Sequence, residues 1–337
     1  MKKVAVVILN WNGKNLLDEF LPSVVAHTPE EIADVFVADN GSTDDSVSFL
    51  NDNFPAVKII RLDKNYGFAE GYNRALDSIP HKYSVLLNSD VEVTDGWLEP
   101  LVSHLEMHPE VSACQPKILS YRKKENFEHA GACGGFIDSL GYPFCRGRLF
   151  VEVEKDKGQY DTVCSVFWAT GAALFIRTAD YKAVGGLDDT FFAHMEEIDL
   201  CWRLKSRGKE IVCIPQSVVY HLGAATLSTE SPRKTYLNFR NNLLMLYKNL
   251  PSRRVKQVLI VRLLLDCMAL MQMALTCKIA NAAAVYRAIR DFYNTKEEYR
   301  AKRTENLNKA VKREFNEMYA GSIVADYYLK RKKKIKM

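Results

Sequence analysis

The sequence predicts an α/β protein with a helical C-terminal appendage. Short apolar runs alternate with segments of helical pattern through the first half of the chain, which is typical of parallel sheets whose strands are joined by helices. Each of the first four apolar runs is followed by a turn rich in Asn, Asp or Gly. From Lys234 onward the chain is helical in pattern and rich in Leu, Met and Ala. Residues 1–232 and 233–337 are therefore expected to form the α/β domain and the appendage.

Four buried strands are expected in the first half of the chain. Strands are predicted at Val4–Leu9, Val35–Ala38, Val57–Leu62 and Tyr83–Leu87, and helices over Lys14–Ala26, after Asp45 to about Asn51, and after Phe68 to Asp77. In open α/β sheets, ligands bind beyond the carboxyl ends of the strands. The polar turns are therefore expected to line one crevice, although such turns are polar in many α/β proteins. No GxGxxG or GxxxxGK[ST] motif is present, so neither a dinucleotide site nor a P-loop is expected.

Residues 111–222 are expected to add strands around one clear helix. The strand-like pieces are Val163–Trp168, Ala172–Ile176, Glu210–Ile214 and Val218–Tyr220. The helix is expected from about residue 196 to Ser206. Over this span Glu196, Asp199 and Arg203 share one helix face at i, i+3 and i+7.

Positive charge is concentrated at the C-terminus. The formal net charge is +5, and six cations lie near the end of the chain: Lys330, Arg331, Lys332, Lys333, Lys334 and Lys336. The remainder of the chain therefore carries a formal charge of −1. A neutral body with a basic tail is not typical of nucleic-acid enzymes. It favours contact with an anionic membrane surface, where each cation contributes about 1 kcal/mol; the alternative is a solvated tail without a partner.

Eight cysteines are present, and none forms a CxxC pair. A chain of 337 residues can bury a full core without a disulfide framework. We therefore interpret the cysteines as reduced, mostly buried thiols of a cytosolic protein. Only six apolar residues follow Met-Lys-Lys before Asn10, which predicts a strand and no signal peptide.

Two acidic residues at strand ends are candidates for binding a nucleotide and a metal ion. Asp39 directly follows the second predicted strand, where its carboxylate can accept hydrogen bonds from a base or a ribose. Asp90 closes the triplet Asn88-Ser-Asp90 after the fourth strand. Mg²⁺ and Mn²⁺ prefer oxygen ligands and take few of them from protein. Asp90 is therefore a candidate ligand of an ion that holds a diphosphate; the alternative is an ordinary turn residue.

Glu196 and Glu197 stand at the start of the predicted helix. Acids at this position commonly stabilise the helix dipole. The alternative is that one of them is a general base that removes the proton of an acceptor hydroxyl, while a metal neutralises a leaving diphosphate. His221 follows the last predicted strand and is a candidate metal ligand, although a lone histidine is more often structural.

Six motifs in this order resemble family 2 glycosyltransferases. They are Val-Ile-Leu-Asn-Trp-Asn-Gly, Val-Ala-Asp-Asn-Gly-Ser-Thr-Asp, Asn-Tyr-Gly-Phe-Ala-Glu-Gly-Tyr-Asn, Leu-Leu-Asn-Ser-Asp, Thr-Gly-Ala-Ala and Phe-Phe-Ala-His-Met-Glu-Glu-Ile-Asp-Leu. The resemblance covers about residues 3–250 and is closest to the bacterial rhamnosyltransferase-like and galactofuranosyltransferase-like branch. It implies a GT-A fold with a mixed, mostly parallel sheet flanked by helices. It also implies a nucleotide-sugar donor, a Mn²⁺ or Mg²⁺ ion and inversion at the anomeric carbon.

The resemblance further implies roles for individual residues. Five positions match nucleotide-binding residues, with Asp39 matching the acid that binds the base: Asn10, Asp39, Asn65, Gly67 and Asn88. Asp90 and His221 match metal ligands. Glu197 matches the catalytic base, and Glu196 a residue that binds the acceptor or the sugar. The remaining positions match residues around the donor and acceptor sugars, which are Trp168, Thr170, Gly171 and His194, or structural turn residues, which are Asp188 and Asp189.

Three positions depart from the family's pattern. Asn88 stands where many members have Asp, so metal binding by this triplet rests on Asp90. Glu197 is one methylene longer than the usual Asp, which leaves the choice between Glu197 and Glu196 as base open, with Glu197 favoured. His194 stands where Tyr is common.

An apolar segment, residues 258–276, predicts a long helix in the appendage. Arg262, Asp266 and Gln272 interrupt it, so a transmembrane helix is not favoured, and Arg262 can pair with Asp266 at i, i+4. The segment is expected to lie at a membrane interface, since basic residues precede it. The alternative is a buried packing or dimerisation helix. Residues 294–337 are expected to be helical.

Together these features predict a metal-dependent, inverting glycosyltransferase at the cytoplasmic face of the plasma membrane. The expected reaction moves a rhamnose-like deoxysugar or a hexose from a nucleotide diphosphate to a glycan or polyprenyl-linked glycan in cell-surface polysaccharide synthesis. No nucleic-acid partner is expected, and a homodimer through the C-terminal helices is a further expectation. Two alternatives remain open, a galactofuranosyl-type transferase with another donor and a non-catalytic nucleotide-sugar-binding module.

Overall fold

The computed structural model describes residues 2–223 and 231–337. Most of the loop Leu222-Gly-Ala-Ala-Thr226, which follows His221, lies outside the described residues. The first part of the chain contains β1 (Val4–Asn10), α1 (Lys14–His27), β2 (Ala33–Asn40), α2 (Ser46–Asn53), β3 (Lys58–Leu62), α3 (Gly67–Asp77), β4 (Tyr83–Leu87), β5 (Val91–Val93) and α4 (Glu99–Met107). These bounds confirm the predicted alternation of strands and helices.

The middle of the chain completes one sheet and builds a second. Its elements are β6 (Val111–Ser120), β7 (Gly135–Asp138), β8 (Pro143–Cys145), β9 (Arg148–Leu149), β10 (Glu152–Val153), β11 (Cys164–Ser165), β12 (Ala173–Arg177), α5 (Thr178–Ala183), η1 (Asp189–Phe191), α6 (Glu196–Ser206) and β13 (Glu210–His221). The C-terminal elements are α7 (Pro232–Asn249), α8 (Ser252–Leu275), α9 (Ile279–Thr295), η2 (Lys296–Tyr299), α10 (Arg300–Lys309), β14 (Met318–Tyr319) and α11 (Ile323–Tyr328).

The central sheet has the strand order β11-β13-β6-β12-β4-β1-β2-β3, with β5 beside β13. Strands β3, β2, β1 and β4 run parallel to one another, whereas β12 is antiparallel to β4 and β6. The sheet is therefore mixed but mostly parallel, as expected. In β1, Val4, Val6 and Ile8 belong to the core on one face, and Ala5 and Val7 to the core on the other, because successive side chains of a strand point to opposite faces.

Several strand predictions need correction. The strand predicted over Val163–Trp168 is confined to β11, and the pieces Glu210–Ile214 and Val218–Tyr220 form one strand, β13, with an irregular register between them. Strand β6 was not predicted, because Gln115, Pro116 and Lys117 interrupt its apolar pattern. Lys117 nevertheless lies buried, with its ammonium group 2.7 Å from the carboxylate of Asp156.

The second sheet has the order β10-β9-β8-β7-β14. Its strand β14 comes from the end of the chain and runs parallel to β7, so the expectation that residues 294–337 are helical throughout is wrong. The buried Asp138 carboxylate, which ends β7, accepts a hydrogen bond from the Ile323 backbone N–H at 2.9 Å. This contact anchors the start of α11 beside the end of β7.

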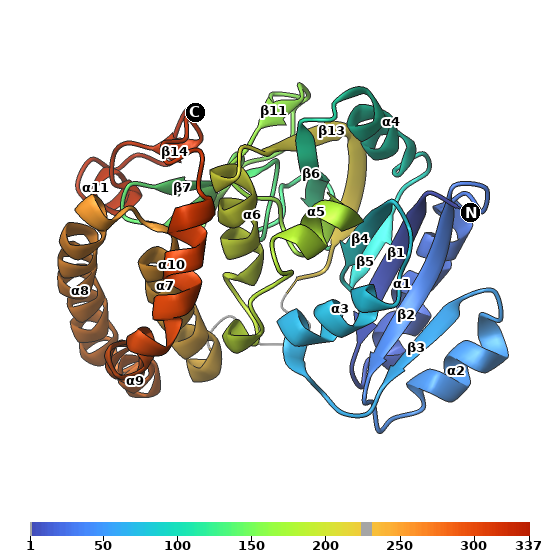
Figure 1. The fold of residues 1–337 in the computed structure, drawn as a ribbon, viewed down its shortest axis with the longest axis horizontal. Coiled ribbons are helices and arrows are strands. Elements are labelled where there is room, and N and C mark those ends of the chain that lie inside the picture. Colours follow the sequence, from blue (N-terminus) through green and yellow to red (C-terminus); the bar gives the residue numbers. More distant parts are fainter. Residues whose placement is uncertain (1, 224–230) are drawn as a thin grey trace.

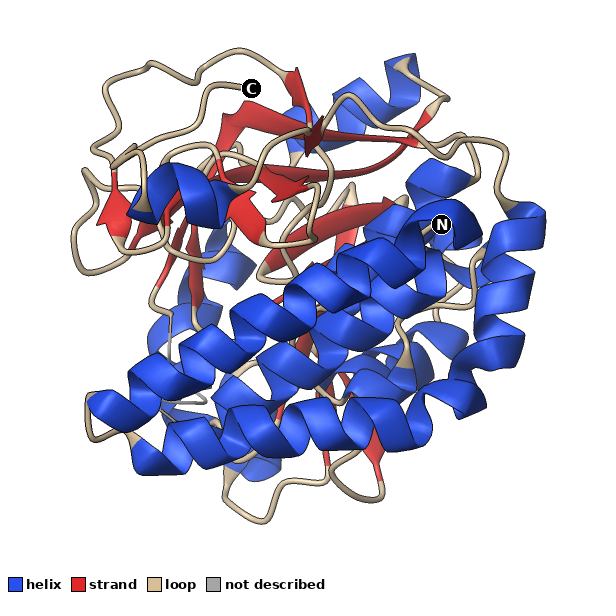
Figure 2. Ribbon diagram, turned by 90° about the vertical axis from the view of Figure 1, so that its left-hand side faces the viewer, coloured by secondary structure: helices blue, strands red, loops and turns tan. Residues whose placement is uncertain are grey.

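The C-terminal helices lie on the side of the molecule opposite β2 and β3 (Figure 1). Viewed from that side, long helices cover much of the face (Figure 2). Leu243, Leu244 and Leu246 of α7 belong to the same core cluster as residues of α3 and α6. All eight cysteines are free, and they are mostly buried, with Cys267 and Cys277 exposed. The expectation of unpaired, mostly buried thiols is therefore confirmed.

Candidate active site

The first part of the site lies at the carboxyl ends of β1 and β2. The two strands pair so that Asn10 stands beside Asp39, with Asn10 Nδ2 3.4 Å from Asp39 Oδ1. The Ser42 backbone N–H donates to Asp39 Oδ2 at 3.2 Å. Asn10 and Asp39 are buried, and Asn10 Oδ1 has no hydrogen-bond partner among the described residues. The predicted convergence of these two side chains is therefore present, with one acceptor still to be satisfied.

Asn40, the last residue of β2, fastens the turn that precedes α3. Its side-chain Nδ2 donates to Asn65 Oδ1 at 3.2 Å and to the Gly67 carbonyl at 3.0 Å. Its side-chain Oδ1 accepts from the Tyr66 N–H at 3.0 Å. Gly67 has a φ of +77°, and a Cβ there would lie 2.6 Å from the ring of Phe192. Asn65 and Gly67 are thus held next to the end of β2. Asn40 was not predicted, although it adjoins Asp39 in the same motif.

The second part of the site joins the end of β4 to the end of β13. Pairing of β5 with β13 brings His221 beside Asp90, with Nε2 of the imidazole 3.1 Å from Asp90 Oδ1. On the other side of the ring, Nδ1 lies 3.4 Å from Glu128 Oε2. Burial lowers the pKa of His221, but hydrogen bonds and charge from Asp90 and Glu128 outweigh it and raise that pKa to about 10. Asn88 Nδ2 lies 3.4 Å from the same Nε2 atom.

Asp90 and His221 fit a divalent cation of the Mn²⁺ or Mg²⁺ type. The carboxylate of Asp90 is the kind of ligand that such ions prefer, and the imidazole of His221 would bind through Nε2 once the ion displaces its proton. These ions complete their coordination with water and phosphate oxygens. Within residues 2–223 and 231–337, no group of three or more His, Cys, Asp or Glu is arranged to hold a metal. Two protein ligands are nevertheless sufficient for an ion that is shared with a diphosphate.

The third part of the site is the pair of acids at the start of α6. Glu196 is buried and Glu197 is partly exposed. The Oε2 atoms of both are buried without a hydrogen-bond partner in the described part of the chain. Burial raises the pKa of Glu197 to about 7. Burial and the charge of Glu197 together raise the pKa of Glu196 well above its usual value. Glu197 is therefore the acid of the pair that loses its proton first, near neutral pH.

The loop that leads into α6 has an unusual backbone. Phe192 has φ 62° and ψ −57°, and the Ala193 N–H donates to the Phe191 carbonyl at 2.7 Å. These values describe a γ-turn of the rare, strained kind. His194 and Met195 follow with φ of 71° and 74°. Non-glycine residues in such regions cost about 1–3 kcal/mol each and persist only where surrounding contacts hold them.

The comparison with known proteins decides the family. A family model described as "Glycosyl transferase family 2" matches residues 5–162, which contain the first two parts of the site except His221. This part of the chain belongs to glycosyltransferase family 2. The expected rhamnosyltransferase-like branch is supported as well, because one relative is named as an L-rhamnosyltransferase.

Curated relatives of this family 2 chain are similar at low identity. O-antigen biosynthesis protein RfbC of Myxococcus xanthus is 25% identical over 238 residues, which cover 69% of this chain and 18% of that protein. N-acetylglucosaminyl-diphospho-decaprenol L-rhamnosyltransferase of Mycobacterium tuberculosis is 25% identical over 234 residues, covering 64% of this chain and 75% of that enzyme. The match thus spans less than a fifth of the length of RfbC but most of the rhamnosyltransferase.

Solved structures show that the fold is GT-A. TarS of S. aureus in complex with UDP-GlcNAc superposes with a TM-score of 0.57 at 16% identity, covering 91% of this chain and 89% of that chain. Mannosyltransferase PcManGT from Pyrobaculum calidifontis, in complex with GDP-Man and Mn²⁺, gives 0.54 at 15% identity, covering 93% and 87%. The GT-A fold expected from the family 2 motifs is confirmed.

The loop over residues 168–172 lies between the second and third parts of the site. The Asn88 N–H donates to the Ala172 carbonyl at 3.0 Å, and a Cβ added to Gly171 would lie 3.9 Å from Glu197 Cβ. The Thr170 N–H donates to the side chain of Gln115 at 3.0 Å. Gly171 is therefore placed between the predicted nucleotide and base residues.

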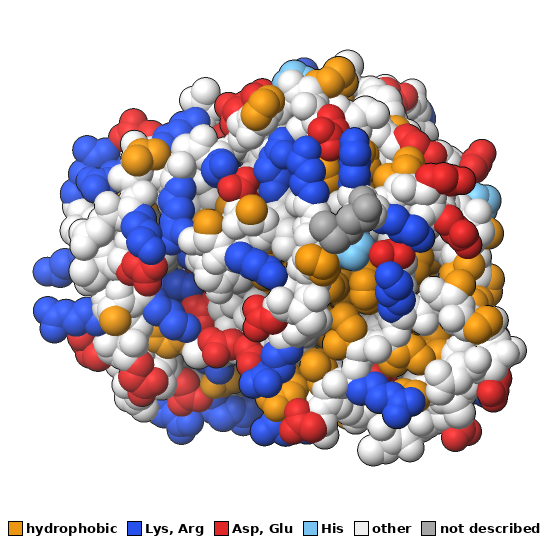
Figure 3. Space-filling model, turned by 45° about the vertical axis from the view of Figure 1, so that its right-hand side comes forward, with side chains coloured by type: hydrophobic (Ala, Val, Ile, Leu, Met, Phe, Trp, Pro, Cys, Tyr) orange, Lys and Arg blue, Asp and Glu red, His pale blue; other side chains and the backbone are white. Residues whose placement is uncertain are grey.

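Of the predicted sugar-binding residues, Trp168 is buried and His194 is partly exposed. The indole N–H of Trp168 donates to the Phe136 carbonyl at 2.9 Å, and its ring packs directly against Gly135. Trp168 thus lies beneath the second sheet. The Nε2 atom of His194 is buried without a partner among the described residues, and burial lowers the pKa of His194 to about 4. On the face seen in Figure 3, hydrophobic side chains gather beside a histidine and both acidic and basic side chains.

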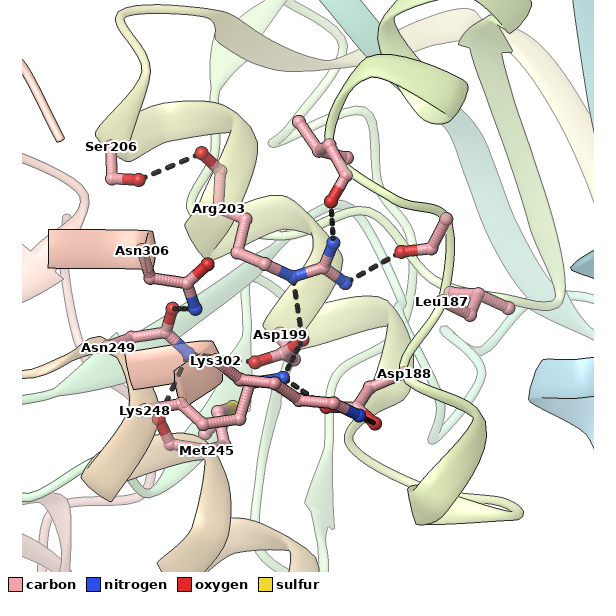
Figure 4. A network of polar contacts seen from close by, with 12 residues as sticks. Leu187, Asp188, Asp199, Arg203, Ser206, Met245, Lys248, Asn249, Lys302 and Asn306 are labelled. Atoms are coloured by element: carbon pink, nitrogen blue, oxygen red, sulfur yellow. Dashed lines mark hydrogen bonds and ion pairs between the residues drawn. The ribbon is translucent and has the colours of Figure 1, made fainter. Parts of the chain in front are cut away.

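A buried polar network supports α6 from behind (Figure 4). Asp199 Oδ2 lies 2.8 Å from Arg203 Nε and 2.9 Å from Lys248 Nζ. Lys248 also contacts Asp188, whose carboxylate lies 2.7 Å from Lys302 Nζ. The network ties α6 to α7 and α10. Asp188 thus makes the contacts of a structural turn residue, as we interpreted it from the sequence.

Proposed function

We propose that this family 2 glycosyltransferase is metal-dependent and inverting. We propose that it moves a sugar from a nucleoside diphosphate to the hydroxyl group of a glycan or polyprenyl-linked glycan. The observation that carries the proposal is Glu197, a carboxyl group with a pKa of about 7 and an unpartnered buried oxygen among the described residues, adjoining Gly171. A general base works best when its pKa lies near the pH of the reaction.

In the proposed reaction, Glu197 removes the proton of the acceptor hydroxyl group while the oxygen of that hydroxyl attacks the anomeric carbon. The bond between the anomeric carbon and the diphosphate oxygen breaks on the opposite face, and the nucleoside diphosphate departs with the bonding electrons. Asn10 and Asp39 orient the nucleoside. Asp90 and His221 would hold the divalent cation, which neutralises charge on the leaving diphosphate. The pKa of Glu196 is raised well above its usual value, and in its protonated form Glu196 can donate a hydrogen bond to a sugar or acceptor oxygen.

The relatives guide the choice of substrate. One of them is named as an L-rhamnosyltransferase of a diphospho-decaprenol-linked sugar, and another as an O-antigen biosynthesis protein. For this chain we propose a rhamnose-like deoxysugar or hexose donor and a diphospho-polyprenyl-linked glycan acceptor in cell-surface polysaccharide synthesis. A galactofuranosyl-type transferase differs from this proposal in its donor. A non-catalytic binding module would bind the donor without turning it over.

A thermal-shift panel of nucleoside diphosphates and nucleotide sugars, each with Mn²⁺, Mg²⁺ or EDTA, tests binding. A ligand at 100 times its Kd stabilises the native state by about 2.7 kcal/mol. We expect one nucleotide sugar to raise the Tm only with metal, and Asp90→Ala to abolish that increase. Release of nucleoside diphosphate from the ligand that shifts the Tm, with a polyprenyl-linked acceptor present, then tests turnover. A metal-dependent shift without turnover would favour the binding module, and no shift with any ligand would refute the site.

We also propose that α8 rests on an anionic membrane surface at the cytoplasmic face. Among the described helices, α8 is the one long and apolar enough to cross a membrane by length and composition, which is weak evidence for spanning. Its outer face carries a continuous stripe of exposed apolar residues: Ile260, Leu264, Met268, Met271 and Leu275. Exposed Arg253 and Lys256 precede the stripe, and Arg287 and Arg290 are exposed on α9. An apolar stripe with basic flanks is typical of interfacial helices.

The inner face of α8 argues against spanning. Arg262 Nη2 lies 3.4 Å from Asp266 Oδ1, which confirms the predicted pairing. Arg262 also donates to the Leu140 carbonyl at 3.0 Å, and the Tyr142 hydroxyl donates to Asp266 at 3.2 Å. Because these buried polar contacts fasten one side of α8 to the catalytic fold, only its other side is free to meet lipid. The helix is thus suited to lie on a bilayer, and a homodimer through the stripe is the competing proposal.

A further inference from the structure

We propose that Asn241, on α7, is a positioning residue that holds the strained loop before α6 and thereby fixes the direction of the Glu197 carboxylate. This inference rests on the proposed function, because it assigns Asn241 to the placement of the proposed base. Asn241 lies outside all six motifs discussed above, and it is completely buried.

The contacts of Asn241 are concentrated on that loop. Its Nδ2 atom lies 2.9 Å from the carbonyl oxygen of Phe191, 2.9 Å from that of Ala193 and 2.8 Å from that of His194. Its Oδ1 atom accepts a hydrogen bond from Arg240 Nε at 2.9 Å. This bond fixes the orientation of the amide, so that the NH₂ group faces the loop. The two hydrogens of this NH₂ group therefore face three carbonyl oxygens within four residues, so one hydrogen is shared between two of them.

The Ala193 and His194 carbonyls depend on this donor because the backbone there is not regular, whereas the Phe191 carbonyl also accepts from the Ala193 N–H. The γ-turn at Phe192 and the positive φ values at His194 and Met195 turn carbonyl groups away from any helix or strand ladder. A buried carbonyl without a donor is costly. The amide of Asn241 satisfies these groups and holds the turn in the conformation from which α6 begins at Glu196.

The opposite side of the loop is fastened to the nucleotide end of the site. The Phe192 carbonyl accepts from the Phe68 N–H at 2.9 Å, at the first turn of α3. The Phe192 ring fills the space where a side chain on Gly67 would stand. The loop is therefore held between α3 and α7, and removal of the α7 side frees the segment that carries the two acids.

Arg240 adds a second attachment from α7, with its Nη2 atom 2.8 Å from the Thr190 carbonyl. Arg240 acts on the start of the loop, whereas Asn241 acts on the γ-turn and on His194. Because Arg240 also orients the Asn241 amide, the two side chains act on the loop together. Asn238, one turn earlier on α7, donates to the Lys234 carbonyl of its own helix at 3.0 Å and provides a matched control.

Hydrogen–deuterium exchange of residues 190–200 tests the holding role without any substrate. We compare wild type, Asn241→Ala, Asn241→Ser, which keeps one donor, and Asn238→Ala. The Ala193 and His194 amides should exchange at least about 10-fold faster in Asn241→Ala, at an intermediate rate in Asn241→Ser and at the wild-type rate in Asn238→Ala. The β1–β4 core should keep its protection in all four proteins. If Asn241→Ala does not fold, Asn241→Ser supplies the comparison.

Kinetics with the donor found by the binding panel test the effect on the base. A base displaced by about 1 Å costs about 100-fold in rate, so kcat should fall by about that factor in Asn241→Ala while the donor KM stays within about twofold. Water entering the loosened loop should also move the acidic limb of the pH–rate profile to lower pH. Unchanged exchange at residues 192–195, or faster exchange with unchanged kcat and pH profile, would overturn the inference. If wild type turns over no donor, the proposed function fails, and the exchange result still decides whether Asn241 holds the loop.

Discussion

At the scale of single residues, the site separates two neighbouring glutamates by their surroundings. Glu196 is buried and lies beside the charge of Glu197, so its pKa is raised well above the usual range. Glu197 is partly exposed, and burial raises its pKa only to about 7. Two carboxyl groups whose pKa values are driven apart can hold different protonation states at one pH. This environment favours Glu197 as the base, a choice that the motif leaves open.

The first prediction concerns the rate of the Glu197→Gln variant. Glutamine keeps the size of the side chain but cannot accept the proton, so kcat should fall by about 100-fold or more. In wild type the base acts only when it is ionised, so kcat should be half-maximal at about pH 7 and level off above it. The Glu196→Gln variant is the matched control, because the neutral amide resembles the protonated acid; it should retain most of the activity. Equal losses in the two variants would contradict this assignment.

The second prediction concerns the stability of the same variant. A carboxyl group whose pKa is raised by folding favours the native state at low pH, and this contribution is lost as the pH rises through about 7. Glu197→Gln removes the charge that is buried at high pH. Its Tm should therefore exceed that of wild type by more at pH 8.5 than at pH 5. Melting curves at the two pH values check this, and a difference in Tm independent of pH would show that Glu197 is already ionised at pH 5.

At the scale of elements, α6 is held from two sides. Its N-terminus carries the acids, and its inner face carries Asp199 and Arg203, which share the buried network with Lys248 (Figure 4). The cations Lys248 and Arg203 lower the pKa of Asp199 despite its burial, which raises it. Helices α6, α7 and α10 therefore form one unit around this network, although the sequence assigns α6 to one predicted domain and α7 and α10 to the other.

The third prediction is that Lys248→Met strongly destabilises the protein. Asp188 and Asp199 would each lose a buried ionic partner, and breaking such a pair costs about 3–5 kcal/mol. Urea unfolding of the purified variants measures the change. Lys309→Met is the control, because Lys309 pairs with Glu305 on the exposed face of α10, and such pairs contribute about 0.3–0.5 kcal/mol. A similar small change in both variants would mean that Arg203 and Lys302 alone stabilise the two aspartates.

The elements that follow periodic patterns could be predicted from the sequence. Strand β4 has the predicted bounds, and the helix predicted from residue 196 to Ser206 is α6. Strand β6 could not be predicted, because the partners that satisfy its Gln115 and Lys117 come from distant loops. Strand β14 was missed for a similar reason, since a two-residue strand depends on its neighbour and carries no pattern of its own.

Those site residues that stand directly at the end of a predicted strand could be predicted from the sequence. Asn10, Asp39 and Asp90 lie at strand ends in the order of the chain, so the topology alone brings them to one edge of the sheet. Glu128 and Asn241 act through contacts made by the fold, and the sequence around them contains no motif. The predicted roles of Trp168 and His194 at the sugars stay predictions, and the burial of Trp168 restricts its contact with a ligand.

At the scale of the whole molecule, the polar site and the apolar face of α8 belong to different parts of the surface. Several cations of the predicted basic tail face acidic groups of the protein. Lys330 and Lys332 lie 2.9 Å and 3.2 Å from Asp326, and Lys333 lies 3.5 Å from Glu152. These pairs reduce the charge that the tail can offer to lipid headgroups. The α8 stripe therefore becomes the main determinant of the proposed membrane contact.

The fourth prediction is that a double variant, Leu264→Glu and Met268→Glu, loses binding to vesicles of phosphatidylglycerol. The two carboxylates would lie in the apolar stripe and oppose both insertion and the anionic surface. Co-sedimentation should show binding of wild type to these vesicles, weaker binding to phosphatidylcholine, and at least about 10-fold loss in the variant. Met107→Glu on α4, which replaces another exposed apolar side chain, is the control. If wild type does not bind the vesicles but forms dimers, and the double variant does not form dimers, the homodimer is favoured.

The pairing of β14 with β7 has a consequence for synthesis of the chain. The hydrogen bond from the Ser139 N–H to the Gly321 carbonyl, at 3.3 Å, joins residues 182 positions apart. At about 5–20 residues per second, translation leaves that edge of the small sheet without its neighbour for roughly 10–40 s. An unpaired strand edge is open to association with other chains. The nascent protein therefore passes through a period in which its larger sheet can be complete while the smaller one is still exposed, and slower translation would lengthen that exposure.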